Sequence, residues 1–194
     1  KIMCGIVGYV GERDCTEVLL NALSKLEYRG YDSAGIAVFD GEKINVAKSV
    51  GRLAALKEKI KNNTPEGVMG IGHTRWATHG RPSDVNSHPH TDCSGKFAIV
   101  HNGIIENFMS LKEELIAKGH KFVSETDTEV VAHLIEDVYE GDFVEAVNKV
   151  LNRIEGSYSL AFMCQDYPDT LICTKKDNPL VIGLGEGENF IASD

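Results

Sequence analysis

The order of the predicted elements favours an α+β fold in which two sheets carry helices on their outer faces. Strands dominate the first hundred residues, helices follow, and strands return towards the C-terminus. With 194 residues, of which 42% are hydrophobic and 25% charged, the chain has the size and composition of one globular domain with a substantial core.

Apolar runs bounded by turn residues define the strands. Asp40-Gly41, between the second and third runs, is a strong hairpin signal. A polar stretch rich in His, Gly and Pro, from residue 74 to about residue 95, is longer than most connections, which marks it as a functional loop. Strands are predicted at residues 4–10, 33–39, 43–50, 68–73, 97–101, 157–164, 170–174, 180–184 and 189–192.

Helical periodicity and capping residues define the helices between these strands. Asp14 and Glu17 have capping-box spacing at the start of the first helix, and Gly30 follows its end. Asp127 is a candidate N-cap for the fourth helix, which has one apolar face. Helices are predicted at residues 14–28, 53–61, 108–118, 128–139 and 143–154.

Charge and cysteine content exclude several classes of protein. The net charge of −9 argues against binding to nucleic acid or to anionic membranes. No apolar run approaches the ~18 residues that a membrane span requires, and the run after Cys4 is too short for a signal peptide. The five cysteines are odd in number and form no CxxC pair, which favours a reducing cytoplasm over a disulfide framework or a structural zinc site.

Cys4, near the N-terminus and followed by Gly5, is a candidate nucleophile. A neighbouring α-amine has a pKa of roughly 7.7–8.0 and is therefore partly neutral at physiological pH, as a general base must be. The thiol is the best nucleophile among the small side chains, and glycine leaves room for a substrate beside it. The structural alternative is a buried cysteine at the start of a strand.

Five of the seven histidines lie in the window from His73 to His101, with His79, His88 and His90 between them. They are either satisfied core and loop residues or a metal site in which His88 and His90 are a ligand pair. The window contains no HExxH motif and no acidic residues at ligand spacing, which weighs against a metal. A metal-dependent hydrolase built on this cluster is kept as an alternative.

His101-Asn102-Gly103 follows an apolar strand and has two possible meanings. An asparagine amide beside a glycine N–H supplies two donors for an oxyanion hole. Asn-Gly is also the most frequent dipeptide of type I′ turns.

Four further residues have a functional and a structural interpretation. Arg75 suits two-pronged binding of a carboxylate, and Trp76, the only tryptophan, either walls a polar pocket or covers the core. Asp127 either caps a helix or receives an ammonium group. Arg29 either interacts with the dipole of the first helix or reaches back toward Cys4.

These segments together resemble the class II glutamine amidotransferases, whose nucleophile is an N-terminal cysteine. The match runs over essentially the whole chain and is closest to the members that use a hexose phosphate. The resemblance implies a four-layer αββα sandwich of the N-terminal-nucleophile hydrolase type, with no cofactor. The segments that carry it are CGIVG (4–8), RGYDSAG (29–35), HTRWATHG (73–80), SHPH (87–90), HNGIIEN (101–107) and SETDTE (124–129).

The resemblance also implies roles for individual residues. Cys4 is implied to attack the side-chain amide of L-glutamine with its own α-amine as base, while Asn102 and the Gly103 N–H bind the oxyanion. The implied binding and supporting residues are Arg75, Thr78 and His79 for the α-carboxylate, Asp127 for the α-ammonium, Trp76 for a closing loop, and Arg29 and His88 as support.

The chain departs from this family at both ends. Lys1-Ile2-Met3 precede Cys4, so its nitrogen as written is a peptide amide that cannot accept a proton. In the family this cysteine becomes residue one when the initiator methionine is removed, and Lys1 and Ile2 are expected to be an added or upstream extension. Residues 1–194 are expected to form a glutaminase domain truncated at its C-terminal end, with the isomerase region absent.

The expected acceptor of the ammonia is fructose 6-phosphate, bound by the missing isomerase domain of a cytoplasmic homo-oligomer. Two alternatives remain open besides the metal-dependent hydrolase. One is the glutaminase domain of another amidotransferase, and the other is a non-catalytic domain that binds an amino acid and regulates a fused partner.

Overall fold

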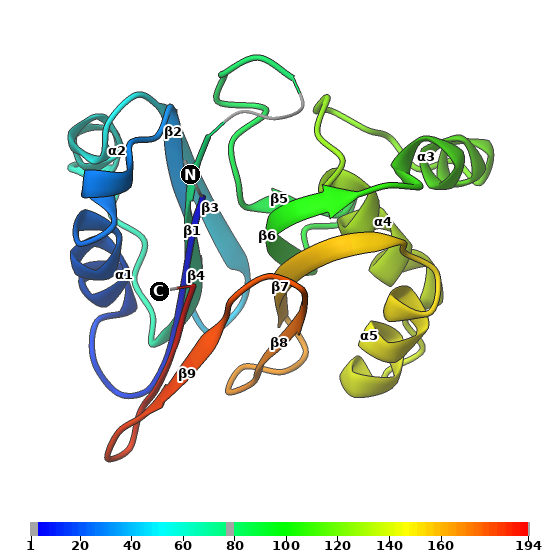
Figure 1. Ribbon diagram of the computed structural model, residues 1–194. Coiled ribbons are helices and arrows are strands. Elements are labelled where there is room, and N and C mark those ends of the chain that lie inside the picture. The colour runs from blue at the N-terminus through cyan, green and yellow to red at the C-terminus, as the bar shows by residue number, and fades with distance from the viewer. Residues whose placement is uncertain (1–3, 77–79, 194) are drawn as a thin grey trace.

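The computed structural model describes residues 4–76 and 80–193, which form two sheets with helices outside them (Figure 1). The strands are β1 (Gly5–Val10), β2 (Ser33–Phe39), β3 (Ile44–Val50), β4 (Met69–Arg75), β5 (His90–Thr91), β6 (Phe97–Ile105), β7 (Gly156–Cys164), β8 (Leu171–Lys176), β9 (Val181–Leu184) and β10 (Asn189–Ala192). The helices are α1 (Cys15–Ser24), α2 (Leu53–Ile60), α3 (Phe108–Ala117), α4 (Glu129–Val138) and α5 (Phe143–Leu151), with a 3₁₀ turn η1 (Glu27–Arg29) after α1.

The two sheets are antiparallel. The first has the strand order β3-β2-β4-β1-β10-β9, and the second has the order β5-β6-β7-β8. Strand β1 therefore lies in the middle of the first sheet, beside β4 and the last strand, β10. Ser193 closes this pairing, because its Oγ accepts a hydrogen bond from the N–H of Ile6 and its own N–H donates to the Ile6 carbonyl.

Alternating side chains of the central strands enter different cores. In β1, Ile6 packs in the core between the two sheets, whereas Val7 packs in the core beneath α1 and α2. In β6, Val100 belongs to the core between the sheets and Ile99 to the core beneath α3, α4 and α5. Both faces of these central strands are thus buried, which is why the strands are continuous apolar runs.

These three cores separate four layers, α1 and α2, the first sheet, the second sheet, and α3 to α5 (Figure 1). The predicted α+β fold and the four-layer αββα sandwich are therefore confirmed. Among residues 4–76 and 80–193, no helix combines the length and apolar composition needed to cross a membrane.

Most predicted elements are present with ends shifted by a few residues, and three differ in substance. The strand predicted to end at His101 continues to Ile105, the first helix ends at Ser24 before η1, and the long polar stretch contains the short strand β5. The Asp40 hairpin is confirmed, because its carboxylate accepts hydrogen bonds from the N–H groups of Glu42 and Lys43.

Gly35 of β2 allows the loop that carries His88 to lie against the first sheet. A β-carbon at residue 35 would collide with the main-chain carbonyl of His88 and lie 3.1 Å from Pro89 Cδ. The absence of a side chain at this position is therefore a packing requirement.

We expect Gly35→Ala to destabilise the protein by about 1–3 kcal/mol, because the loop must move to make room for a methyl group. Urea unfolding followed by circular dichroism measures the change. Gly183→Ala is the matched control, since its new methyl group meets Phe190 Cβ at an ordinary 3.6 Å. Equal stabilities of the two variants would contradict the packing requirement.

Candidate active site

Most of the predicted site residues line one cavity of about 330 Å³ at the end of the β1, β4 and β6 strands. The predicted residues around it are Cys4, Arg75, Trp76, His88, Asn102, Gly103 and Asp127. Thr78 and His79 lie outside the described residues. Arg29 lies in η1, and its supporting role stays a prediction. A larger groove of about 1080 Å³ beside β3 contains none of the predicted site residues that the structure describes.

Cys4 lies immediately before β1, where its main chain is fixed by the neighbouring strand. The N–H of Gly5 donates to Thr74 Oγ1 at 3.1 Å, and a β-carbon on Gly5 would lie 2.8 Å from that oxygen. Glycine at residue 5 therefore allows the main chain beside the nucleophile to approach β4 closely.

The thiol of Cys4 is held in its protonated form. Burial raises the pKa of Cys4 by disfavouring the thiolate, and this outweighs the lowering by the N–H of Trp76 and the charge of Arg75. The N–H of Trp76 donates to Cys4 Sγ at 3.1 Å. Because the resting group is a thiol, a base must remove its proton when the sulfur attacks.

Asn102 is oriented by its neighbours from two other strands. Its Nδ2 donates to the Cys4 carbonyl at 2.9 Å, and its Oδ1 lies 3.0 Å from His73 Nε2. His73 Nε2 also lies 3.0 Å from the carbonyl of His101, so it carries the proton and donates to two acceptors. Burial lowers the pKa of His73 to about 3, so the ring is neutral. The amide of Asn102 is thereby fixed with its NH₂ group toward Cys4.

Asn102 and Gly103 lie inside β6, opposite Ser159 and Tyr158 of β7, and the type I′ turn is therefore wrong. Gly103 has φ +114°, and a β-carbon there would collide with the carbonyl of Ser157. Only glycine suits this position, because other residues rarely adopt that φ and the space is occupied. An amide side chain and a glycine main chain thus stand side by side at the cavity.

Asp127 does not cap α4, and that structural interpretation is wrong. The residue that precedes α4 is Thr128, while the buried carboxylate of Asp127 accepts a hydrogen bond from the N–H of Ile105 at 2.8 Å. This contact fixes a negative charge at the cavity. Its position depends on β6 and the start of α4 together.

Arg75, at the end of β4, brings a positive charge to the same cavity. Its side chain is buried, and its Nη2 donates to the Gly80 carbonyl at 3.4 Å. Burial lowers the pKa of Arg75, yet a guanidinium remains charged in proteins. One cavity therefore holds a cation, an anion and a thiol, which suits a zwitterionic ligand with a reactive side chain.

The histidines beneath the cavity are packed and neutral. The rings of His73 and His88 stack with centroids 4.2 Å apart, and His90 meets His88 edge-on at 4.7 Å. Burial, followed by the repulsion of neighbouring positive groups, holds the pKa values of His88 and His90 well below their usual range. The nitrogens of stacked rings lie in the ring planes, so those of His73 and His88 do not point at one another.

This arrangement does not support a metal site in the histidine window. In the described part of the chain, no group of three potential metal ligands includes a histidine from residues 73–101. The orienting function of His73 was not predicted from the sequence, and neither were Asn178 and Pro179, which complete the lining of the cavity.

Comparisons with known proteins agree with this geometry. The family model described as "Glutamine amidotransferase domain" matches residues 73–194. The glutamine--fructose-6-phosphate aminotransferase [isomerizing] of Caldanaerobacter subterraneus is 59% identical over 192 residues, and that of Thermococcus kodakarensis is 56% identical over 194. Each alignment covers 99% of this chain and 32% of the relative, so the chain spans about a third of their length.

Solved structures extend the comparison to the fold. The glutamine phosphoribosylpyrophosphate amidotransferase from B. subtilis superposes with a TM-score of 0.83 at 29% identity, over 98% of this chain and 42% of that one. The αββα sandwich is thus of the N-terminal-nucleophile hydrolase type found in such enzymes. With a family model that covers most of its length and this shared architecture, the chain belongs to the glutamine amidotransferase domain family.

Proposed function

We propose that this chain hydrolyses the side-chain amide of L-glutamine through a thioester on Cys4. The observation that carries the proposal is the convergence of the Cys4 thiol, the Asn102 amide, Arg75 and Asp127 on one cavity. Membership of the glutamine amidotransferase domain family supports the choice of substrate.

The nucleophilic step requires a base close to a protonated thiol. We propose that the active form begins at Cys4, so that its α-amine accepts the thiol proton as Sγ attacks the amide carbon. The same amine then returns the proton to the departing nitrogen, which leaves as ammonia. Water hydrolyses the thioester to glutamate and restores the thiol, with the amine again acting as base.

Charge that develops on the amide oxygen requires donors that are already in place. The proposed donors are Asn102 Nδ2, which lies 2.9 Å from the Cys4 carbonyl in the absence of substrate, and the N–H of Gly103. His73 holds the amide in the donating orientation, so no reorganisation is needed when the oxyanion forms.

The α-carboxylate and the α-ammonium of glutamine are proposed to bind at opposite charges of the cavity. Arg75 receives the carboxylate, with Thr78 and His79 assisting, and Asp127 receives the ammonium. Trp76 is proposed to close over the substrate, while Arg29 and His88 support the site. The hydrogen bond from the Ile105 N–H holds the Asp127 carboxylate in place at the cavity, which supports its assignment as the partner of the ammonium group.

The acceptor of the ammonia is proposed to be fructose 6-phosphate in an isomerase domain of a longer, cytoplasmic, homo-oligomeric protein. The support is the name shared by the relatives, which are 52–59% identical to this chain, although the chain covers only 32% of their length. The glutaminase domain of another amidotransferase is the alternative, and the amidotransferase from B. subtilis is less similar, at 29% identity.

The α-amine hypothesis predicts that a chain beginning at Cys4 releases ammonia from glutamine, whereas the chain beginning at Lys1 is nearly inactive. Activity of the shorter form should rise with pH through the pKa of the amine, near ~8, because only the neutral amine accepts a proton. Ammonia release is measured across pH for both forms, after mass spectrometry has verified each N-terminus. Comparable rates from an unprocessed Lys1 form would exclude the α-amine as the obligatory base.

The oxyanion-hole hypothesis predicts that Asn102→Ala lowers kcat by about 10²–10³ with little change in KM, because the donor acts when charge develops. Steady-state kinetics on glutamine, corrected for the folded fraction, measures this. Asn62→Ala, at an exposed position outside the cavity, is the control. A variant of Asn102 that melts early but turns over normally would show that the residue is only structural.

The clamp hypothesis predicts opposite substrate preferences for two variants. Arg75→Ala should lose about 2–5 kcal/mol of transition-state stabilisation with glutamine and with glutaramate, but little with 4-aminobutyramide, which lacks the carboxylate. Asp127→Asn should instead lose most with glutamine and 4-aminobutyramide and little with glutaramate, which lacks the ammonium. The measurement is kcat/KM for each of the three amides. Equal losses for all of them would assign both residues to stability.

A further inference from the structure

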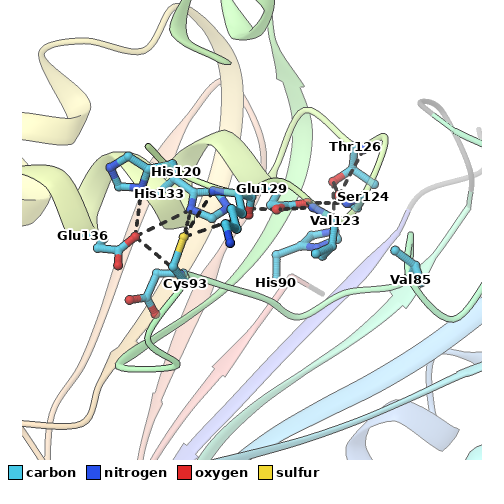
Figure 2. A network of polar contacts seen from close by, with 12 residues as sticks. Val85, His90, Cys93, His120, Val123, Ser124, Thr126, Glu129, His133 and Glu136 are labelled. Atoms are coloured by element: carbon cyan, nitrogen blue, oxygen red, sulfur yellow. Dashed lines mark hydrogen bonds and ion pairs between the residues drawn. The ribbon is translucent and has the colours of Figure 1, made fainter. Parts of the chain in front are cut away.

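A second cluster of reactive side chains lies beside α4 (Figure 2), and none of its members lines the cavity. Cys93 follows β5, His120 follows α3, and His133 and Glu136 lie one turn apart on α4. Each offers a ligand atom, and these four atoms lie within 4.8 Å of one another. We propose that Cys93, His120, His133 and Glu136 form a structural binding site for one Zn²⁺ ion.

The separations between the ligand atoms fit a tetrahedral ion. Zinc bonds of 2.0–2.3 Å place neighbouring ligand atoms roughly 3.3–3.8 Å apart. Cys93 Sγ lies 3.5 Å from His133 Nδ1, and His133 Nδ1 lies 3.6 Å from Glu136 Oε1. His120 Nδ1 lies 2.9 Å from the same Glu136 oxygen, which is closer than two ligands of one ion, so zinc binding would move these two atoms apart.

His120 has the strongest reason to need a cation. Its side chain is only 10% exposed, and its Nδ1 is buried with no hydrogen-bond partner among residues 4–76 and 80–193. Glu136 Oε1 is close to this nitrogen but not in hydrogen-bond geometry. A nitrogen lone pair and a carboxylate oxygen this close would both be stabilised by a cation bound to the two of them.

Both histidines have a carboxylate at the ring nitrogen that faces away from the cluster. His133 Nε2 lies 2.8 Å from Glu129 Oε2, and His120 Nε2 lies 3.7 Å from Asp137 Oδ1. Metal-bound histidines typically donate their other N–H to such a partner, which fixes the ring and its tautomer. The proton of His133 therefore lies on Nε2, and its Nδ1 lone pair faces Cys93.

Glu129 is itself firmly held. It accepts hydrogen bonds from the N–H groups of Val123 and Ser124 and from His133. With these contacts Glu129 orients His133 through Nε2 and is not a fifth ligand.

The donor set selects zinc among common ions. A thiolate with two imidazoles and a carboxylate suits a borderline-soft ion that accepts four-coordinate geometry, whereas magnesium and calcium prefer oxygen ligands. Four protein ligands leave no position open for substrate, which indicates a structural site. Zinc would tie the segment after β5 and the segment before α4 to the helix itself.

A hydrogen-bonded Cys93–His133–Glu129 triad with a reactive thiol is the competing interpretation. That triad leaves the buried Nδ1 of His120, 2.9 Å from Glu136 Oε1, without a hydrogen bond. Zinc uses the lone pair of this nitrogen, binds Cys93 as the thiolate, and displaces the thiol proton to solvent.

The test is a titration of the metal-free chain with Zn²⁺ in competition with a chromophoric chelator, with Co²⁺ as a spectroscopic probe. We expect one equivalent of Zn²⁺, a thiolate-to-Co²⁺ charge-transfer band with tetrahedral d–d bands, and a Zn²⁺-dependent rise in Tm. Zn²⁺ should also slow alkylation of Cys93. Absence of tight binding, or alkylation of Cys93 that is fast and unaffected by Zn²⁺, would overturn the proposal.

Two variants test the ligands without disturbing the core. Cys93→Ala and His120→Ala leave the buried His133 of α4 unchanged and should each weaken Zn²⁺ binding by roughly 100-fold, and Cys93→Ala should abolish the charge-transfer band. Cys173→Ala, at a half-buried position on β8, and Cys4→Ser are matched controls and should keep one equivalent. Unchanged affinity in both ligand variants, or loss of binding in Cys4→Ser, would show that zinc binds elsewhere.

Discussion

The hydrogen bonds from His73 Nε2 join the two sheets at the point where the site is formed. His73 belongs to β4 of the first sheet, and its acceptors, the His101 carbonyl and Asn102 Oδ1, belong to β6 of the second. The proton on His73 Nε2 binds Asn102 Oδ1 and so decides which way the amide points. In that orientation Asn102 Nδ2 donates to the Cys4 carbonyl. An inverted His73 ring, or the tautomer with its proton on Nδ1, would remove this constraint. Burial of the ring keeps it neutral.

Because the histidines beneath the cavity are neutral, the electrostatic potential inside it is set by the few charged side chains that line it. The stacked histidines, of which His88 is the central ring, contribute packing and hydrogen bonds but no net charge. Arg75 and Asp127 are then the charged groups that define the polarity of the lining, in a setting where water screens them weakly. The raised pKa of Cys4 keeps its side chain neutral as well. A resting thiolate would compete with a substrate carboxylate for the positive charge of Arg75.

The sequence was sufficient for the layers and most of the site, but not for the orientation of individual side chains. Apolar runs and turns predicted the elements because each is a local property, whereas Asn-Gly suits a turn or a strand equally well until β7 is paired with β6. Asp127 resembled a helix cap for the same reason, since its true partner, the N–H of Ile105, is 22 positions away. Motif resemblance named seven residues that line one cavity, whereas only tertiary contacts show that His73 orients Asn102.

The proposed zinc site could not have been predicted from the sequence, because its ligands come from distant segments. Spacing rules search for ligands that are close in sequence, whereas Cys93 and His133 lie 40 positions apart.

A continuous set of polar contacts runs from His133 through Glu129 to Ser124. From Ser124 it continues through Thr126 to His90, which packs against His88. The start of α4 is thus fixed on one side by the second cluster and on the other by the floor of the cavity. Because Asp127 lies two residues before α4, the position of the anion at the cavity depends on both.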